Sequence, residues 1–378
     1  MSVHDVLGEL VRWWLADQPV AMATVVATWR SAPRQPGATM LVGPDGTAVG
    51  SVSGGCVEAA VYDLGLAVTD SGEPRLARYG VSDDDAFEVG LTCGGTVEIF
   101  VERIDRASYP EFGQVAEAIS AGRPVAVATV VHGDADRLGR RLVVWPDRRA
   151  GGLGSTSLDD AVAADVQGML VGGRNGSLRY GSAGERLGGE LTVFVSSFAP
   201  PPRMIIFGAI DFGAALARLG GFLGYRVTVC DARPVFATSR RFPGVEVVVD
   251  WPHRYLTGEI DAGHVDSRTV VCVLTHDPKF DVPALRVALA QPFAYVGAMG
   301  SRRTHTDRVA RLRQEGVPPE QLNRLASPIG LDLGGRTPEE TAVSIVAEIV
   351  ARRSGGSGRR LSELDGPVHG QPGSPDGT

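Results

Sequence analysis

A segment near the N-terminus returns about 100 residues later, and this repeat constrains the fold more than any other feature. Residues 19–26 (Pro-Val-Ala-Met-Ala-Thr-Val-Val) recur at 124–131 (Pro-Val-Ala-Val-Ala-Thr-Val-Val) with one difference. Three further pairs follow in the same order: 40–45 with 142–147, 78–80 with 179–181, and 94–101 with 188–195. Such a period is too long for a solenoid array, so the first half is predicted to be a duplicated α+β unit.

Each copy is predicted to begin with a helix and to continue as short strands. Apolar residues recur at helical spacing over residues 3–16, and residues 111–121 form the counterpart helix in the second copy. Short β-branched runs broken by Gly and Asp follow in both copies. The copies are expected at about residues 3–104 and 111–198, in one domain over residues 1–199.

Three consecutive prolines, Pro200 to Pro202, predict a stiff linker, because such a run continues neither a helix nor a central strand. Beyond it, β-branched runs alternate with helical segments. This pattern predicts an α/β domain over residues 203–353, a Rossmann-like doubly wound parallel sheet. Residues 354–378 are rich in Gly, Ser and Pro and are predicted to be a disordered tail.

Composition excludes some function classes. The net charge of −7 leaves no basic surplus to neutralise phosphates, so a nucleic-acid-binding protein is not expected. No apolar run reaches the roughly 18 to 20 residues that a membrane span needs. The N-terminus has no basic segment before an apolar core, so the four cysteines are expected to be reduced thiols in the cytoplasm.

The first strand after the linker runs into a glycine-containing loop. A dinucleotide fingerprint needs three glycines, and Gly208 and Gly213 fit the first and last positions. Asp231 follows the next strand, where an acidic residue binds a ribose in nicotinamide enzymes. The middle position holds Ile210, whose side chain would crowd a pyrophosphate. Gly208 and Asp231 are candidate cofactor-binding residues, but NAD(P) in its usual pose is not expected.

Two cysteines flanked by glycines lie in the first copy. Cys56 follows Gly54 and Gly55, which permit backbone conformations closed to other residues and leave room for a partner. Cys93 is followed by two further glycines. A thiol in such a loop can be a metal ligand or a nucleophile, or simply a small buried side chain. Cys56 aligns with Ser157 of the second copy, so any chemistry is expected in the first copy.

The loop after a predicted buried strand at residues 269–274 carries His276, Asp277 and the chain's one lysine, Lys279. In a doubly wound sheet the carboxyl ends of the strands line the ligand crevice. His276 and Asp277 are therefore candidates for proton transfer or ligation, and Lys279 for cofactor binding. The alternative is a solvated loop.

The strand at residues 294–296 is followed by Gly300, Ser301, Arg302 and Arg303, which open a helix. Backbone amides at a helix N-terminus, together with serine and arginine side chains, favour an anion such as phosphate. Ser301, Arg302 and Arg303 are candidate cofactor-binding residues, and a solvated helix start is the alternative.

Taken together, these motifs resemble the XdhC/CoxI family. Residues 31–38, 50–58 and 91–95 are similar to its N-terminal domain, and residues 275–277, 300–303 and 329–340 to its C-terminal Rossmann domain. The resemblance covers roughly residues 5–352, with both domains in order. The departure is Ile210, where many relatives have glycine.

The resemblance implies a cofactor chaperone rather than a turnover enzyme. Such a protein binds molybdenum cofactor (molybdopterin) and prepares it for a molybdenum hydroxylase of the xanthine dehydrogenase or carbon monoxide dehydrogenase type. It also implies a cysteine desulfurase as sulfur source and, by analogy, a homodimer. The thiol of Cys56 or Cys93 suits the soft metal, with Cys56 the candidate ligand, and the turn from Gly300 to Arg303 suits the cofactor's phosphate.

Two other hypotheses remain open from the sequence. An NAD(P)-dependent oxidoreductase would use the Rossmann unit, with Gly208 and Asp231 in its favour and Ile210 against it. An interaction scaffold without ligand would use the cysteines as packing residues only.

Overall fold

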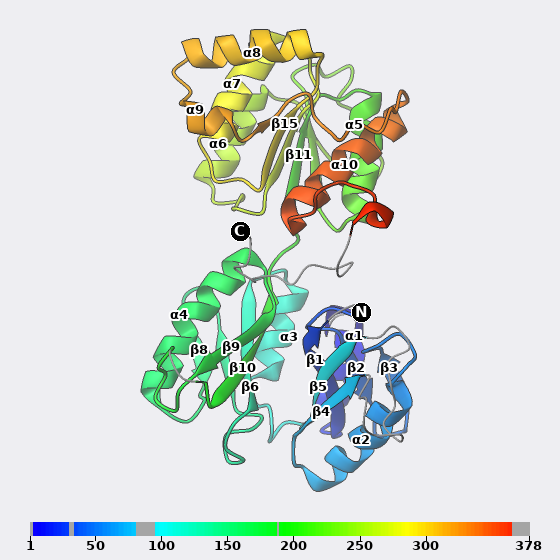
Figure 1. Ribbon diagram of the computed structural model, residues 1–378, viewed down its shortest axis with the longest axis vertical. Coiled ribbons are helices and arrows are strands. Elements are labelled where there is room, and N and C mark those ends of the chain that lie inside the picture. Colours follow the sequence, from blue (N-terminus) through cyan, green and yellow to red (C-terminus); the bar gives the residue numbers. More distant parts are fainter. Residues whose placement is uncertain (1–2, 30–33, 81–94, 187–188, 365–378) are drawn as a thin grey trace. The chain divides into compact units, whose positions relative to one another are not determined.

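The computed structural model describes residues 3–29, 34–80, 95–186 and 189–364 of the chain (Figure 1). It divides into two compact units, one ending at Pro200 and the other running from Pro201 to Leu364. The division therefore falls inside the run of three prolines.

The first unit contains two five-stranded antiparallel sheets with the same strand order, β3-β2-β1-β5-β4 and β8-β7-β6-β10-β9. The first copy comprises α1 (Val3–Leu15), β1 (Val20–Trp29), β2 (Thr39–Val42), β3 (Ala48–Gly50), α2 (Glu58–Ser71), β4 (Arg75–Gly80) and β5 (Thr96–Ile104). The second comprises α3 (Phe112–Ser120), β6 (Val125–His132), β7 (Arg141–Val144), β8 (Arg149–Gly151), α4 (Thr156–Gly172), β9 (Gly176–Tyr180) and β10 (Leu191–Phe198).

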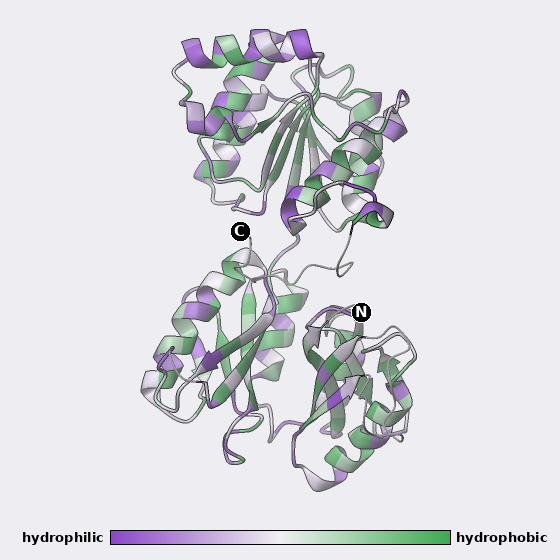
Figure 2. Cartoon of the chain, in the orientation of Figure 1, coloured by the Kyte–Doolittle hydropathy of each residue, from purple (hydrophilic) through white to green (hydrophobic). Residues whose placement is uncertain are grey.

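The repeated segments form β1 and β6, the central strands of the two sheets, and their apolar side chains explain that position. Both faces of β6 are buried from Val125 to Val131, and β1 is buried over most of its length. Figure 2 shows strands that are largely hydrophobic and helices in which hydrophobic and hydrophilic residues alternate. Each copy has its own core between its sheet and the long helix α2 or α4.

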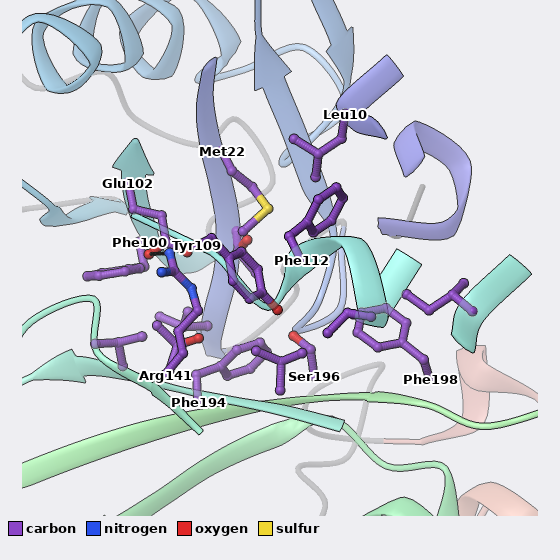
Figure 3. A pocket seen from close by; sticks show the side chains of 17 residues that line it. Leu10, Met22, Phe100, Glu102, Tyr109, Phe112, Arg141, Phe194, Ser196 and Phe198 are labelled. Carbon is purple, nitrogen blue, oxygen red and sulfur yellow. Dashed lines mark hydrogen bonds and ion pairs between the residues drawn. The ribbon is translucent and has the colours of Figure 1, made fainter. Parts of the chain in front are cut away.

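The two copies pack against each other through equivalent residues. A small cluster joins Val26 and Phe100 of the first copy to Val131 and Phe194 of the second, which occupy matching positions in their sheets. A larger cluster brings α1 and α3 together. An internal cavity of about 40 Å³ remains between the copies (Figure 3).

The second unit is a six-stranded parallel sheet of order β13-β12-β11-β14-β15-β16. Its elements are β11 (Arg203–Phe207), α5 (Asp211–Phe222), β12 (Arg226–Cys230), β13 (Glu246–Val248), α6 (Pro252–Asp261), β14 (Val270–Val273), α7 (Pro278–Leu289), β15 (Tyr295–Ala298), α8 (Arg302–Gln314), α9 (Pro319–Leu322), β16 (Leu325–Ala326) and α10 (Pro338–Ser354). One core packs α5 and α10 on one face, and a second packs α6, α7 and α8 on the other. The predicted doubly wound parallel sheet is confirmed.

The C-terminal segment begins with an ordered stretch. Gly355 closes α10 in the left-handed conformation, and a short 3₁₀ helix, η1, spans Leu361–Glu363. The remainder of the predicted disordered tail, residues 365–378, lies outside the described residues. No helix in the described part of the chain is long and apolar enough to cross a membrane.

Candidate functional site

The turn that carries Cys56 lies directly before α2. Gly54 and Gly55 adopt φ angles of 88° and 125°, which L side chains rarely adopt. Val52 and Val57 on either side are fully buried in the core of the first copy. The turn is therefore anchored at both ends, with glycine at the two positions whose backbone requires it.

Glu58, the first residue of α2, reaches back and binds this turn. Its carboxylate accepts hydrogen bonds from three backbone amides and two hydroxyls: Ser53 N (2.9 Å), Gly54 N (2.9 Å), Gly55 N (2.8 Å), Ser51 Oγ (2.7 Å) and Ser53 Oγ (2.5 Å). Burial acts to raise the pKa of Glu58, but these hydrogen bonds outweigh it and lower the pKa to about 2. The carboxylate of the first residue of α2 is therefore ionised and holds the turn that precedes the helix.

Cys56 is held by its backbone and stands beside open space. Its amide and that of Val57 donate to the Ser53 hydroxyl at 3.0 and 3.1 Å. The Cys56 side chain packs partly against the first copy's core and remains partly exposed. A Cβ atom at Gly54 or Gly55 would meet no atom of the described residues within 4 Å. A bound molecule can therefore approach the Cys56 sulfur across the glycine backbone.

Cys93 falls in residues 81–94, outside the described part of the chain, so its proximity to Cys56 stays a prediction. Across the described ranges, no group of three or more His, Cys, Asp or Glu side chains is arranged to hold a metal ion. Among the described residues, Cys56 therefore offers a metal a single soft ligand.

The counterpart turn of the second copy has no thiol, and its helix α4 begins at Thr156, so Ser157 lies inside the helix. Ser155 caps α4 by accepting a hydrogen bond from the amide of Leu158. Asp159, the counterpart of Glu58, accepts one from the amide of Leu153 at 2.7 Å. Ser157 stands where the first copy has Cys56. The two copies thus offer a natural comparison between a turn with a thiol and one without.

In the second unit, the loop after β14 carries His276, Asp277 and Lys279. Asp277 caps α7 by accepting the Lys279 amide at 3.1 Å, and its other oxygen pairs with Lys279 Nζ at 3.0 Å. These contacts with Lys279 lower the pKa of Asp277. His276 is exposed beside them. The structure thus brings Asp277 and Lys279 together as an ion pair at the carboxyl edge of the sheet.

Asp231, after β12, is buried and its carboxylate is already engaged. One oxygen accepts the Ala209 amide at 2.8 Å, and the Arg233 guanidinium binds both oxygens at 2.8 and 2.9 Å. Burial acts to raise the pKa of Asp231, but the hydrogen bonds from Arg233 and Ala209 outweigh it and lower the pKa. A ribose hydroxyl would have to displace Arg233 to reach this carboxylate.

The start of α5 differs from a dinucleotide site in two further ways. Gly208 has a φ of 119°, and a Cβ there would lie 3.2 Å from the backbone of Leu274, so glycine serves a close approach of two loops. Ile210 takes the N-cap position without a side-chain cap. Asp211 follows and pairs with Arg241 at 2.8 Å. The negative charge of this exposed carboxylate in the first turn of α5 would repel a pyrophosphate.

The turn after β15 has two exposed arginines. Ser301 caps α8, its hydroxyl accepting the amide of Thr304 at 3.1 Å. Arg302 and Arg303 are exposed, and no ion pair engages either of them within the described residues. Two unpaired guanidinium groups at the first turn of a helix suit an anion.

Two groups that shape these loops were not predicted from the sequence. Glu58 was part of a recognised motif, but its role emerges only from its contacts with the turn. Asp281 is buried and pairs with Arg308 at 2.9 Å, and Arg308 also donates to the Met299 carbonyl. The Asp281–Arg308 pair ties the loop after β14 to the loop after β15. Its only sequence signal is a charge on the apolar face of each helix.

Comparison with known proteins identifies the family. The profile described as the XdhC Rossmann domain matches residues 204–349, and that of the XdhC and CoxI family matches residues 13–80 and 118–181. The chain belongs to the XdhC/CoxI family. The resemblance drawn from the motifs is thereby confirmed, and both units of the structure take part in it.

Relatives of this XdhC/CoxI chain match it over nearly its whole length. A Bacillus subtilis protein named as a probable subunit of xanthine dehydrogenase is 29% identical, covering 93% of this chain and 98% of that protein. The Escherichia coli molybdenum cofactor insertion chaperone PaoD is 27% identical, covering 93% and 88%. The crystal structure of a Bacillus halodurans xanthine dehydrogenase superposes with a TM-score of 0.66 at 26% identity, covering 96% and 98%.

Proposed function

We propose that this chain is a maturation factor for a molybdenum hydroxylase of the xanthine dehydrogenase or carbon monoxide dehydrogenase type. It binds molybdenum cofactor and assists the cofactor's sulfuration and insertion into the apoenzyme. Support comes from the relatives, one named as a molybdenum cofactor insertion chaperone and one as a probable xanthine dehydrogenase subunit. Both match over both units of this chain.

The observation that carries the proposal is the presentation of Cys56. The thiol stands on an anchored turn, beside two glycines that face open space. A molybdenum held by the dithiolene of its pterin is soft and accepts a further soft ligand. Cys56 supplies that ligand, Gly54 and Gly55 allow the approach, and Cys93 is proposed to act beside it.

The second, Rossmann-like unit contributes positively charged side chains that would bind the cofactor's phosphate. Ser301, Arg302 and Arg303 lie at the start of α8, where backbone amides and guanidinium groups suit a terminal phosphate. Lys279, paired with Asp277, adds a further cation, and we propose His276 and Asp277 for proton transfer. Gly208 and Asp231 shape the loop beside them through the contact between Asp231 and Ala209.

The partners follow from the same proposal. They are the apo form of the molybdenum hydroxylase, a cysteine desulfurase that supplies sulfur, and a second copy of this chain in a homodimer. We do not expect NAD(P) to bind, because Ile210, Asp211 and the engaged Asp231 occupy positions that a dinucleotide needs.

Cofactor retention tests the proposal. Purified protein is mixed anaerobically with molybdenum cofactor and desalted, and the retained pterin and molybdenum are assayed. Cys56→Ala and Cys93→Ala are compared with the wild type, and Ser157→Ala provides a matched control at the equivalent position of the second copy. We expect the wild type and Ser157→Ala to retain both pterin and molybdenum, and Cys56→Ala to lose them.

Two outcomes would count against the proposal. Failure of the wild type to retain the cofactor would refute the proposal that this chain carries it. Full retention by Cys56→Ala would remove Cys56 from the site, even if the carrier function stood.

A further inference from the structure

The two copies meet at two equivalent junctions, and the strand registers show which residues correspond. In β1, Thr24 pairs with Thr39, and in β6 its counterpart Thr129 pairs with Arg141. Arg141 is therefore the structural counterpart of Thr39. By the same reasoning, Glu102, opposite Met22, corresponds to Ser196, opposite Val127. At one contact between the copies the paired positions hold Glu102 and Arg141. At the equivalent contact they hold Ser196 and Thr39, which have only hydroxyl groups.

Glu102 and Arg141 form an ion pair that joins the copies and is almost completely buried (Figure 3). Arg141 also donates to the Ser108 carbonyl at 2.9 Å, and its guanidinium lies 4.4 Å from the centre of the Tyr109 ring. Its Nε is buried and has no hydrogen-bond partner. A buried ion pair rarely adds stability over apolar packing. Its presence at one junction only, with a donor unsatisfied, therefore points to a role other than folding.

A surface pocket of about 440 Å³ opens at this charged junction, within the usual size range of small-molecule sites. Glu102 and Arg141 form part of its wall, together with Arg103, Glu111 and Arg140. The remaining wall is largely glycine backbone and two prolines. Glycine is required at Gly151, whose φ is 79° and where a Cβ would collide with the Arg141 carbonyl.

The pocket offers an acceptor and donors that nothing else uses. Within the described residues, no hydrogen bond or ion pair engages the Glu111 carboxylate, and it does not cap α3 although it occupies the N-cap position. Arg140 donates one hydrogen bond, from Nε to the Asp136 carbonyl, which leaves its terminal nitrogens for a ligand.

We propose that this pocket binds an anionic heterocycle with an amino-pyrimidinone edge, the edge shared by pterins and guanine. The Glu111 carboxylate accepts two N–H groups of that edge, since the two oxygens of a carboxylate can bind paired donors. The terminal nitrogens of Arg140 hold the ring carbonyl or the anionic group, and the glycine backbone and prolines flank the ring. Preference for a pterin over guanine rests on the proposed function, but the pocket itself does not depend on Cys56.

Equilibrium binding to the full chain tests this proposal. The probes are pterin-6-carboxylate, followed by its fluorescence, and guanosine 5′-monophosphate, with adenosine 5′-monophosphate as the probe that lacks the edge. Glu111→Gln and Arg140→Gln are the pocket variants, and Glu117→Gln, an exposed carboxylate on α3, is the matched control. We expect each pocket variant to weaken binding by roughly tenfold or more, because a polar group of the bound ring loses its charged partner.

The outcomes separate cleanly. If neither pterin-6-carboxylate nor guanosine 5′-monophosphate binds the wild type, or if Glu111→Gln binds them unchanged, the proposal is overturned. Equal affinity for adenosine 5′-monophosphate would also overturn it. The tighter of the first two probes identifies the source of the edge. If the protein binds pterin-6-carboxylate but does not retain molybdenum cofactor, this site stands and the proposed function fails. If Glu111→Gln retains the cofactor as well as the wild type does, the proposed function stands and this site fails.

Discussion

The carboxylate of Glu58 decides the shape of the turn that carries Cys56. It binds three consecutive backbone amides of the segment before α2, which contains two glycines with positive φ angles. Without that acceptor, these amides and the Ser53 hydroxyl would have to be satisfied by water. The position of the Cys56 backbone therefore depends on a residue two positions away.

Replacing Glu58 with Gln should loosen this turn. The folded pKa of Glu58 is about 2, below its ordinary 4.5, so the ionised form stabilises the fold above about pH 4.5. That contribution is lost as the pH falls toward 2. We expect the hydrogen-exchange protection factors of residues 53–57 to fall in Glu58→Gln at pH 7, and in the wild type only on acidification. Glu73→Gln, an exposed carboxylate just beyond the same helix, is the control. Unchanged exchange in Glu58→Gln would refute this role.

The buried pair of Glu102 and Arg141 gives a second prediction for single residues. Glu102→Gln should lower the free energy of unfolding of the first unit by about 3–5 kcal/mol, because it leaves Arg141 buried without its counter-charge. The double variant Glu102→Ser with Arg141→Thr has the residues of the uncharged contact. It should lower the free energy of unfolding by less than Glu102→Gln does. Denaturant unfolding of the full chain measures both. A double variant no more stable than Glu102→Gln would contradict this view.

At the scale of elements, the start of α10 is set by residues that are neighbours in the sequence. Thr337 accepts the Glu340 amide, Glu340 accepts the Thr337 amide, and Pro338 takes the first helical position. Thr337→Ala should destabilise the second unit by about 1 kcal/mol. Thermal unfolding compared with Thr337→Ser, which keeps the hydroxyl, measures the effect. If both variants lose the same stability, the hydroxyl is not the cause.

At the scale of the whole molecule, the two units have separate cores and are predicted to unfold separately. The cores of the first unit share no residue with those of the second. Calorimetry of the full chain should therefore show two transitions. Arg308→Met leaves Asp281 buried without its partner and should shift only one transition, whereas Glu102→Gln should shift only the other. A single transition moved by both variants would show that the units unfold together.

The sequence by itself determined the elements that depend on local pattern. Helical periodicity, β-branched runs, the capping box of α10 and the proline run predicted helices, parallel strands and the boundary near Pro200, and the motifs identified the family. These features could be predicted because each is encoded within a few neighbouring residues.

Tertiary structure alone decided how side chains far apart in sequence engage one another. It showed that Asp231 is taken by Arg233 and Ala209, that Asp281 pairs with Arg308, and that Glu102 meets Arg141 across the copies. Pairings of this kind depend on strand register and packing over long distances, which no local pattern specifies. For the same reason, the sequence predicted Cys56 and the arginines of α8 as site residues but not the pocket at the junction of the copies.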